Sequence, residues 1–273
     1  MDQRAMDCSS VLGNADLYGL GVRIGVYAQW TATLLTTVFD PSNESALGLL
    51  NLVVQTAMFV GLCTEWARGA NAVGSVITQF LLCGSLSSVT GDGISHLGHV
   101  SGLMRAVFYT GLSAYAIWFW FTGVDTMRGS SCRQVVFFGP SLMTGWFRSM
   151  ARLLSVAGLI LCLCLTLSSI VVCLRRFRSG LTAAFVGPPR RRPQVEISLM
   201  LLSIFLLGLS VATVEYLIRE NNVQGVGASD IGSVAQLIPL LAGGLACILS
   251  VWKIVTHGLL FRKRCWLIFG WHL

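Results

Sequence analysis

Long apolar runs recur along the chain and are separated by short polar stretches. A helix needs about 20 apolar residues to cross the hydrocarbon core of a bilayer. The run at 153–174 is apolar on every side, whereas a barrel strand would alternate between apolar and polar positions. The pattern predicts an all-α, polytopic membrane helix bundle with seven transmembrane helices, forming one integral membrane domain over residues 1–273. The predicted spans are approximately 22–39, 46–64, 71–90, 102–124, 151–174, 197–218 and 234–256.

The composition supports a membrane protein. Hydrophobic residues make up 54% of the chain and charged residues 11%, with a mean hydropathy of +0.72. A soluble domain carries about 25% charged residues, so the charges present here could not cover a surface exposed to water. This excludes an ordinary soluble enzyme and a disordered chain. A nucleic-acid partner is not expected either, because the chain lacks a folded basic surface with aromatic residues, and membrane lipid is the expected partner.

The basic residues predict the orientation in the membrane. Six arginines fall in the loop 175–195, and Arg262, Lys263 and Arg264 fall in the C-terminal tail, so these segments hold nine of the 19 Lys and Arg residues. Basic loops stay in the cytoplasm, where they also meet anionic lipid. Because these segments follow the fifth and seventh spans, they lie on one side of the membrane. We therefore expect an extracytoplasmic N-terminus and a cytoplasmic C-terminus, with the glycosylation sequon at Asn43 cytoplasmic and unmodified.

Two groups of residues raise the question of covalent and metal chemistry outside the spans. This topology places Cys8 and Cys132 in an oxidising compartment, so a disulfide between them is one hypothesis and two free thiols are the alternative. His96 and His99 lie three residues apart near Asp92, a spacing that a metal site could use. A third fixed ligand is missing, so we expect a solvated loop, with no metal and no cofactor.

Ionisable residues near the spans gather on the extracytoplasmic side. Three carboxylates fall there: Glu65 at the end of the second span, Asp125 after the fourth and Glu215 near the end of the sixth. The inner halves of most spans contain fewer polar residues. Charged groups at the edge of hydrocarbon are costly unless they pair or line a cavity, so this pattern indicates a site. The candidate substrate-binding residues at similar depth are Trp118, Trp120, Tyr27, Arg23 and Arg219.

Three catalytic candidates follow: Glu215, Asp125 and Glu65. Glu215 is the deepest and comes first, because burial raises the pKa of a carboxyl group and can keep it protonated for general acid catalysis. A neighbouring arginine would have the opposite effect, and Arg–Glu pairs often only hold helices together. The motifs of serine hydrolases, phosphate-binding loops and zinc proteases are absent from the sequence. The residues therefore favour proton transfer.

Four stretches carry a resemblance to a known family. They are NADLYGLGVRIGVYAQW (14–30), CRQVVFFGPSLMTGWFR (132–148), VEYLIREN (214–221) and QLIPL (236–240). In sequence and in position relative to the spans they resemble a family of fungal seven-helix integral membrane proteins that includes membrane-bound meroterpenoid (terpene) cyclases. The resemblance implies cyclisation of a prenylated, farnesylated polyketide-type substrate in secondary metabolism. The reaction would start by protonating an alkene or an epoxide, without metal, in the endoplasmic reticulum or another endomembrane.

Two functions from different classes remain open. The first is a membrane-bound terpene cyclase of the intramolecular lyase or isomerase type, acting on a lipophilic prenylated small molecule. In that case the aromatic faces of Trp118, Trp120 and Tyr27 would stabilise carbocations along the prenyl chain. The second is a non-catalytic seven-helix membrane receptor or sensor of unknown ligand, whose basic loop at 175–195 could dock a cytoplasmic partner.

Overall fold

The computed structural model describes residues 11–39, 44–67, 71–84, 100–127, 134–138, 143, 145–178, 193–227 and 231–269. This part of the chain is mostly helical. The helices are α1 (Ala15–Tyr18), α2 (Leu20–Phe39), α3 (Glu44–Ala67), α4 (Ala72–Gly84), α6 (Val100–Trp118), α7 (Val124–Thr126), α8 (Trp146–Arg178), α9 (Pro193–Glu220) and α10 (Val234–Phe269). A π-helix, η3 (Phe119–Gly123), joins α6 to α7, and two short strands are β1 (Val11–Leu12) and β2 (Val223–Gln224).

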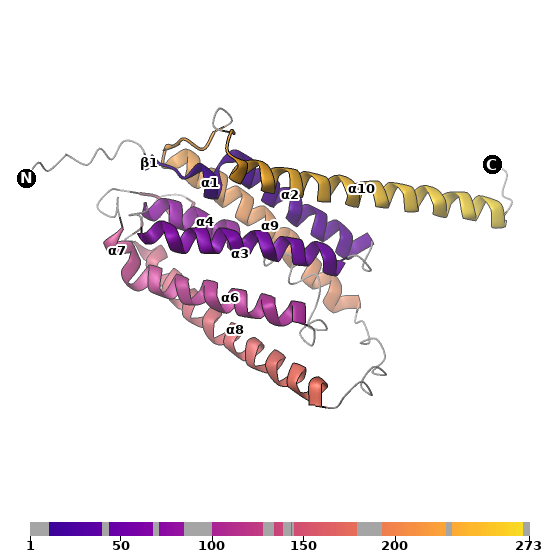
Figure 1. Ribbon diagram of the computed structural model, residues 1–273, viewed down its shortest axis with the longest axis horizontal. Helices are drawn as coiled ribbons and strands as arrows, with labels where there is room; N and C mark the ends of the chain where they lie inside the picture. The colour runs from indigo at the N-terminus through magenta and orange to yellow at the C-terminus, as the bar shows by residue number, and fades with distance from the viewer. Residues whose placement is uncertain are drawn as a thin grey trace, which may run out of the picture.

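The long helices form a bundle in which each runs opposite to the one before it (Figure 1). Helices α2, α4, α8 and α10 begin at the end of the bundle where β1 lies, and α3, α6 and α9 finish there. We call this the amino end and the opposite one the carboxyl end. Each of the seven predicted segments contains a helix in the described part of the chain, although α6 ends at Trp118 and α4 is described only as far as Gly84.

Helices α2 and α10, from opposite ends of the chain, make the closest pairing in the bundle. The sequence GVRIG places Gly21 and Gly25 one turn apart on α2, in the small-residue spacing that lets membrane helices approach closely. A side chain at Gly25 would collide with the backbone of Pro239, and one at Gly243 with the backbone of Gly25. The two helices therefore touch backbone to backbone. Helices α4 and α9, and α6 and α8, form the other two main pairs.

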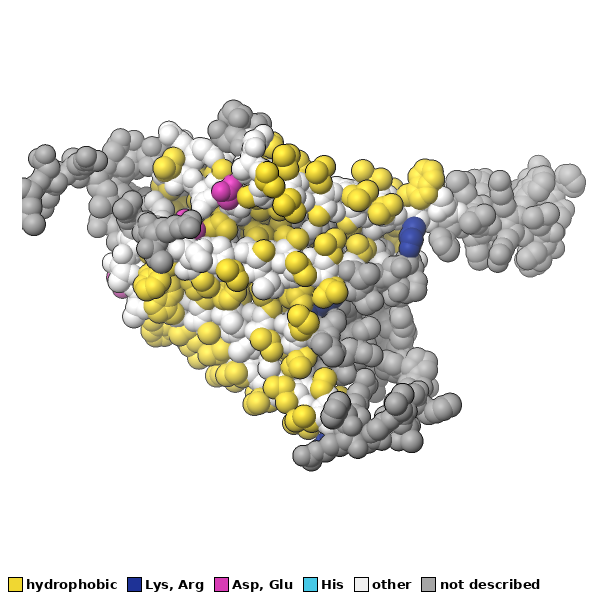
Figure 2. Space-filling view, viewed as in Figure 1, with side chains coloured by type: hydrophobic (Ala, Val, Ile, Leu, Met, Phe, Trp, Pro, Cys, Tyr) yellow, Lys and Arg dark blue, Asp and Glu magenta, His cyan; other side chains and the backbone are white. Residues whose placement is uncertain are grey.

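The outside of the bundle is apolar. On α8, Leu153 and Leu154 are 73% and 64% exposed, and α10 exposes Leu241 and Ile248 in the same way. Figure 2 shows hydrophobic side chains over the flanks, acidic side chains toward the amino end and basic ones toward the carboxyl end. In a soluble protein so much exposed apolar surface would cause association. The distribution is that of a helix bundle surrounded by lipid.

Four helices of the described chain are long and apolar enough to cross a membrane. They contain the segments Leu47–Trp66, Trp146–Arg175, Leu201–Glu220 and Val234–Thr256. Helices α2, α4 and α6 do not meet both conditions. Helix α4 has 13 described residues, and the other two are more polar, because α2 carries Arg23 and Gln29 and α6 carries Arg105. These polar side chains face the interior of the bundle.

Buried polar side chains occur along the whole depth of the bundle. Besides Arg23 at the amino end, the helices bury Gln29, Asn51, Gln55 and Gln79 near their middles. The Gln55 amide nitrogen donates to Asn51 Oδ1 at 2.6 Å, within α3. The expectation that the inner halves of the spans contain few polar groups is therefore wrong. A residue count along the sequence misses them because each of these helices contributes only one or two of the four amides.

The amino end is closed by a short cap formed by β1 and α1. Strand β1 pairs in parallel with β2, with Val11 opposite Val223, and Gly13 N–H donates to the Gln224 carbonyl at 2.9 Å. Helix α1 starts at Asn14, whose side chain accepts from the Asp16 amide, as a helix N-cap does. The cap thus fixes residues 11–18 across the ends of α3 and α4, where a cavity lies.

Candidate functional site

The four stretches that carry the family resemblance meet at the amino end. Arg23 of the first bonds Glu215 of the third, and Gly21 of the first donates to the Gln236 side chain of the fourth. The Asn221 side chain of the third exchanges two hydrogen bonds of 2.9 Å with the backbone of Val135 in the second. Segments far apart in the sequence therefore assemble one structural unit.

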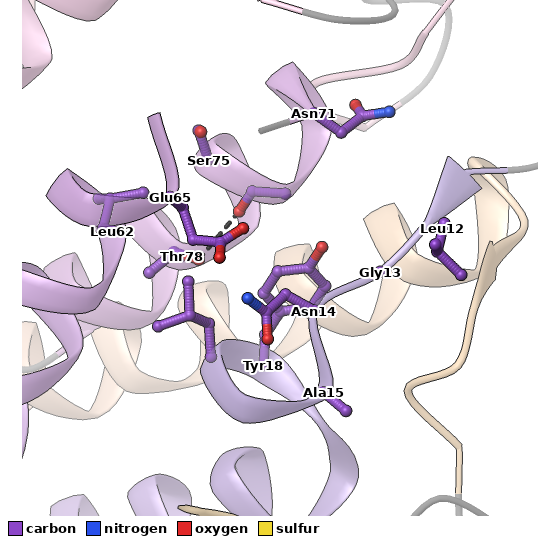
Figure 3. A pocket seen from close by; sticks show the side chains of 12 residues that line it. Leu12, Gly13, Asn14, Ala15, Tyr18, Leu62, Glu65, Asn71, Ser75 and Thr78 are labelled. Carbon is purple, nitrogen blue, oxygen red and sulfur yellow. Dashed lines mark hydrogen bonds between the residues drawn. The ribbon is translucent and has the colours of Figure 1, made fainter. Parts of the chain in front are cut away.

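A half-open cavity of about 380 Å³ lies at the amino end, beside the start of the first of these stretches. The cap supplies one wall, and α3 and α4 supply the other (Figure 3). Glu65 is the charged residue in the lining, and Figure 3 shows its carboxylate and the Tyr18 hydroxyl pointing into the same space. The lining consists of Leu12, Gly13, Asn14, Ala15, Leu17, Tyr18, Leu62, Glu65, Asn71, Gly74, Ser75 and Thr78.

Tyr18 is one of the buried polar residues in the cavity lining. Its side chain is 3% exposed, and burial raises the pKa of the phenol, an effect that the nearby Glu65 carboxylate strengthens. The hydroxyl therefore stays protonated at neutral pH and can donate a hydrogen bond. Gly74 makes this arrangement possible, because a β-carbon there would lie 2.6 Å from the Tyr18 hydroxyl oxygen.

Glu65 differs from the other two predicted acids in having no cation beside it among the described residues. It is partly exposed, on the cavity side of α3, and the neighbouring polar groups are hydroxyls and amides. The Ser75 hydroxyl donates to Met127 Sδ at 3.6 Å, and the Thr78 hydroxyl donates to the Gly74 carbonyl at 2.9 Å. Among the described residues, Glu65 thus faces the cavity with neutral polar groups as its neighbours.

Glu215 lies in an ion pair at a second place in the amino end. Its Oε2 is 2.6 Å from Arg23 Nη1, and its Oε1 accepts from the Tyr27 hydroxyl at 3.1 Å. The Arg23 side chain is 4% exposed, whereas that of Glu215 is 47% exposed. The burial expected for Glu215 is therefore not found: about half of its side chain is exposed, although the arginine that it pairs with is buried. The contact joins α2 to α9, and a catalytic role for Glu215 stays a prediction.

Asp125 lies in a third, separate cluster. Both of its oxygens accept from Arg148, at 2.8 and 2.6 Å, in a bidentate pair. The hydrogen bonds from Arg148 hold the pKa of Asp125 below its ordinary value, with a further contribution from the Arg152 charge. Its side chain is 60% exposed. Asp125 is thus a carboxylate fixed by arginine, outside the cavity.

The five predicted substrate-binding residues lie in different parts of the amino end. Arg23 and Tyr27 surround Glu215, whereas Trp118 packs edge-to-face on Trp66 at 5.1 Å, on the helix that carries Glu65. Trp120 is 5% exposed and packs against Phe119 and Phe147. Arg219 is exposed near the end of α9. None of these five side chains lines the cavity.

Sequence reasoning missed the polar residues that surround Glu65. Tyr18, Asn71, Ser75 and Thr78 are neutral and come from two elements, so they form no cluster along the chain. One signal was present: Asn71 begins α4 in the same way as Asn14 begins α1, and its side chain accepts from the Val73 amide at 3.0 Å. Asn14 and Asn71 thus cap two helix starts, and Glu65 lies near the end of a third helix. This combination could have been found in the sequence.

Several predicted features fall outside the described residues. These are the sequon at Asn43, the candidate disulfide partners Cys8 and Cys132, and the loop with Asp92, His96 and His99. Within the described ranges, no group of three or more His, Cys, Asp or Glu side chains could hold a metal ion.

Comparisons with models of protein families, with curated proteins and with solved structures find no match to this chain.

Proposed function

We propose that the chain is a seven-span integral membrane protein of the endoplasmic reticulum or another endomembrane, with its amino end extracytoplasmic. The alternation of the long helices supports this, since it puts the basic loop after α8 and the basic end of α10 at one end of the bundle. If each residue is assigned to the nearer end of the bundle from its position in the chain, 11 of the 19 basic residues lie toward the carboxyl end. Only four of the 12 acidic residues do so. An excess of Lys and Arg is typical of the cytoplasmic side.

We propose further that this protein is a membrane-bound terpene cyclase and that Glu65 is its proton donor. The observation that carries the proposal is the placement of Glu65 in a half-open cavity, with no ion-pair partner in the described chain. Asp125 and Glu215 are each engaged by arginine. A cavity of 380 Å³ lies within the range of about 300–1,000 Å³ in which proteins bind small molecules.

The reaction that fits this site is an isomerisation that needs no co-reactant. The Glu65 carboxyl donates its proton to the terminal alkene carbon or epoxide oxygen of a prenylated substrate. The carbocation that forms is attacked in turn by the internal double bonds, which close the rings. A final C–H bond gives its proton to the Glu65 carboxylate, so the product has the composition of the substrate and the acid is restored.

The surroundings of Glu65 support binding of a molecule that has both polar and apolar parts. Asn14, Asn71 and the Tyr18 hydroxyl can hydrogen-bond oxygens of the substrate, while Leu12, Leu17 and Leu62 contact its hydrocarbon. A cavity of this size would hold the reacting end of the prenyl chain. The remainder would extend along the apolar outer faces of the helices, where a lipophilic substrate dissolves in the bilayer.

The test compares acid variants in microsomes supplied with a farnesylated polyketide-type substrate and its terminal epoxide. Glu65→Gln keeps the shape of the side chain but removes the proton, so we expect turnover to fall by about 10²–10⁴, the range for general acid catalysis. Glu220→Gln is the matched control, because Glu220 is an exposed carboxylate at the end of α9 that no described contact engages. It should retain full turnover.

Two further variants make the assignment specific. Glu215→Gln and Asp125→Asn remove the ion-paired acids and should retain more turnover than Glu65→Gln, measured per folded molecule. A fully active Glu65→Gln would overturn the assignment of the donor. If the native protein binds such substrates saturably and converts none of them, the receptor interpretation replaces the enzyme.

A further inference from the structure

Two arginines of α8 hold the π-helix η3 at the amino end. Arg148 Nε and Arg152 Nε both donate to the carbonyl oxygen of Trp120, at 3.1 and 2.9 Å. Arg148 Nη2 also donates to the Phe121 carbonyl at 3.3 Å, and the Arg152 guanidinium lies 5.0 Å over the Phe121 ring. In a π-turn the backbone hydrogen bonds join residues five apart instead of four apart, and such turns often occur at functional sites. Here its carbonyls bond charged side chains from another helix.

The segment around η3 reaches the surroundings of the Glu65 cavity at both of its ends. Before the π-turn, Trp118 packs on Trp66, the residue after Glu65 in α3. After it, Met127 accepts from the hydroxyl of Ser75, which lines the cavity. Gly123 lets the Trp118 ring lie against the turn, since a β-carbon there would be 3.0 Å from that ring. The geometry of η3 therefore determines where Trp118 and Met127 lie.

We infer that Arg148 and Arg152 are positioning residues for the Glu65 cavity. They fix the π-turn, and the π-turn sets the Trp118–Trp66 and Met127–Ser75 contacts on the α3 and α4 sides of the cavity. The inference deepens the proposed function and rests on it for its consequence in turnover. The structural arrangement itself can be tested without any substrate.

The chemistry of these contacts requires arginine rather than any cation. Each guanidinium donates through Nε to a carbonyl, and Arg148 at the same time uses its terminal nitrogens for Asp125. Lysine has one ammonium group on a flexible chain and cannot make this set of planar bonds. Replacing both arginines by lysine therefore keeps the charge at the membrane surface but removes the Nε–H donors to Trp120.

Cysteine cross-linking measures the position of η3 directly. Ser75→Cys with Met127→Cys should be joined by a short bis-methanethiosulfonate reagent, which forms a disulfide with each thiol, because Ser75 Oγ lies 3.6 Å from Met127 Sδ and the shorter cysteine leaves only a small gap. In the background Arg148→Lys/Arg152→Lys we expect this cross-link to form at least tenfold more slowly. Mass spectrometry of the linked peptides separates this cross-link from those of the native cysteines.

A second cysteine pair shows whether the whole bundle has changed. Thr36 and Ser250 join α2 to α10 through hydroxyl oxygens 3.1 Å apart, far along the sequence from η3. Thr36→Cys with Ser250→Cys should cross-link equally well with and without the lysine substitutions. The inference is overturned if the Ser75–Met127 cross-link is unaffected, and also if both cross-links are lost, because the arginines would then only stabilise the fold.

Turnover in the native cysteine background gives the functional readout. Arg148→Lys/Arg152→Lys should lower kcat at least tenfold with a smaller change in KM, whereas Arg175→Lys, at the opposite end of α8, should leave both unchanged. A normal kcat in the lysine variant with a slowed cross-link would overturn the positioning role. If no variant and no native protein turns over substrate, the proposed function fails, while the cross-linking result still decides the structural arrangement.

Discussion

Glu65, Asp125 and Glu215 lie at one end of the bundle, but each has different neighbours. Arg148 holds both oxygens of Asp125, and Arg23 with Tyr27 holds those of Glu215. Glu65 has hydroxyls and amides around it and a cavity in front of it. The hydrogen-bond partners, rather than the depth of each residue in its span, distinguish Glu65 from the two carboxylates that pair with arginine.

The Asp125–Arg148 pair predicts a pH dependence of stability. Because Arg148 lowers the pKa of Asp125 in the folded state, the pair stabilises the fold above the ordinary carboxyl value of about 4. The stabilisation is lost as pH falls through the lower folded-state pKa. We therefore expect native protein in detergent to have a slightly higher Tm than Asp125→Asn at pH 7, and this difference to shrink as the pH falls below about 4.

The size of this effect should be small, since the Asp125 side chain is 60% exposed and exposed pairs contribute at most about 1 kcal/mol. Thermal unfolding of both proteins across pH 3–7 makes the measurement. A Tm difference of constant size over the whole range would contradict the role of ionisation and would point to lost packing instead.

The sequence identified all three carboxylates as site candidates and ranked Glu215 first by its depth, whereas the acid that lines the cavity is Glu65. It allowed for an arginine beside Glu215 as an alternative, and Arg23 occupies that place. The cavity was beyond sequence reasoning, because Tyr18 and Asn14 come from the cap while Ser75 and Thr78 come from α4. Their meeting depends on the pairing of β1 with β2, and two-residue strands leave no periodic signal in a sequence.

At the scale of elements, the α2–α10 contact depends on glycine at specific positions. A β-carbon at Gly243 would collide with the Gly25 carbonyl, whereas one at the adjacent Gly244 meets no atom within 4 Å. We expect Gly243→Ala to destabilise the protein by about 1–3 kcal/mol through overpacking. Gly244→Ala should be neutral or stabilising by up to about 1 kcal/mol, because alanine favours the helix.

The two variants differ by one position in one helix and carry the same new methyl group, so each is the control for the other. Their Tm values in one detergent provide the comparison. Equal stability of Gly243→Ala and Gly244→Ala would mean that α2 and α10 do not touch backbone to backbone.

The helices themselves were the most predictable elements. Long apolar runs such as 153–174 identify α8 without ambiguity, and its described limits, Trp146–Arg178, extend past the apolar core into polar ends. The π-helix at Phe119–Gly123 was not predictable, because its aromatic residues fit an α-helix equally well. It depends on Arg148 and Arg152, which reach it from another helix.

At the scale of the whole molecule, the proposed topology makes a glycosylation prediction. The native sequon at Asn43 lies between α2 and α3, on the proposed cytoplasmic side, so it should stay unmodified. An acceptor site inserted on a flexible linker between Gly227 and Ile231 lies on the opposite side and should be modified. Expression with microsomes, followed by glycosidase digestion, reads out both sites, and a glycan at Asn43 would reverse the orientation.

The contact between α2 and α10 also bears on the order in which the protein can assemble. Helix α2 leaves the ribosome first of the long helices and carries Arg23 and Gln29, whereas its closest partner is the last to be made. Until α10 has been synthesised, the face of α2 that carries Gly21 and Gly25 lacks the helix that packs on it in the folded protein. Helix α2 therefore stays without its main partner, in the membrane or at the insertion machinery, until synthesis is complete. We expect a chain truncated before α10 to be degraded by the cell's quality-control machinery.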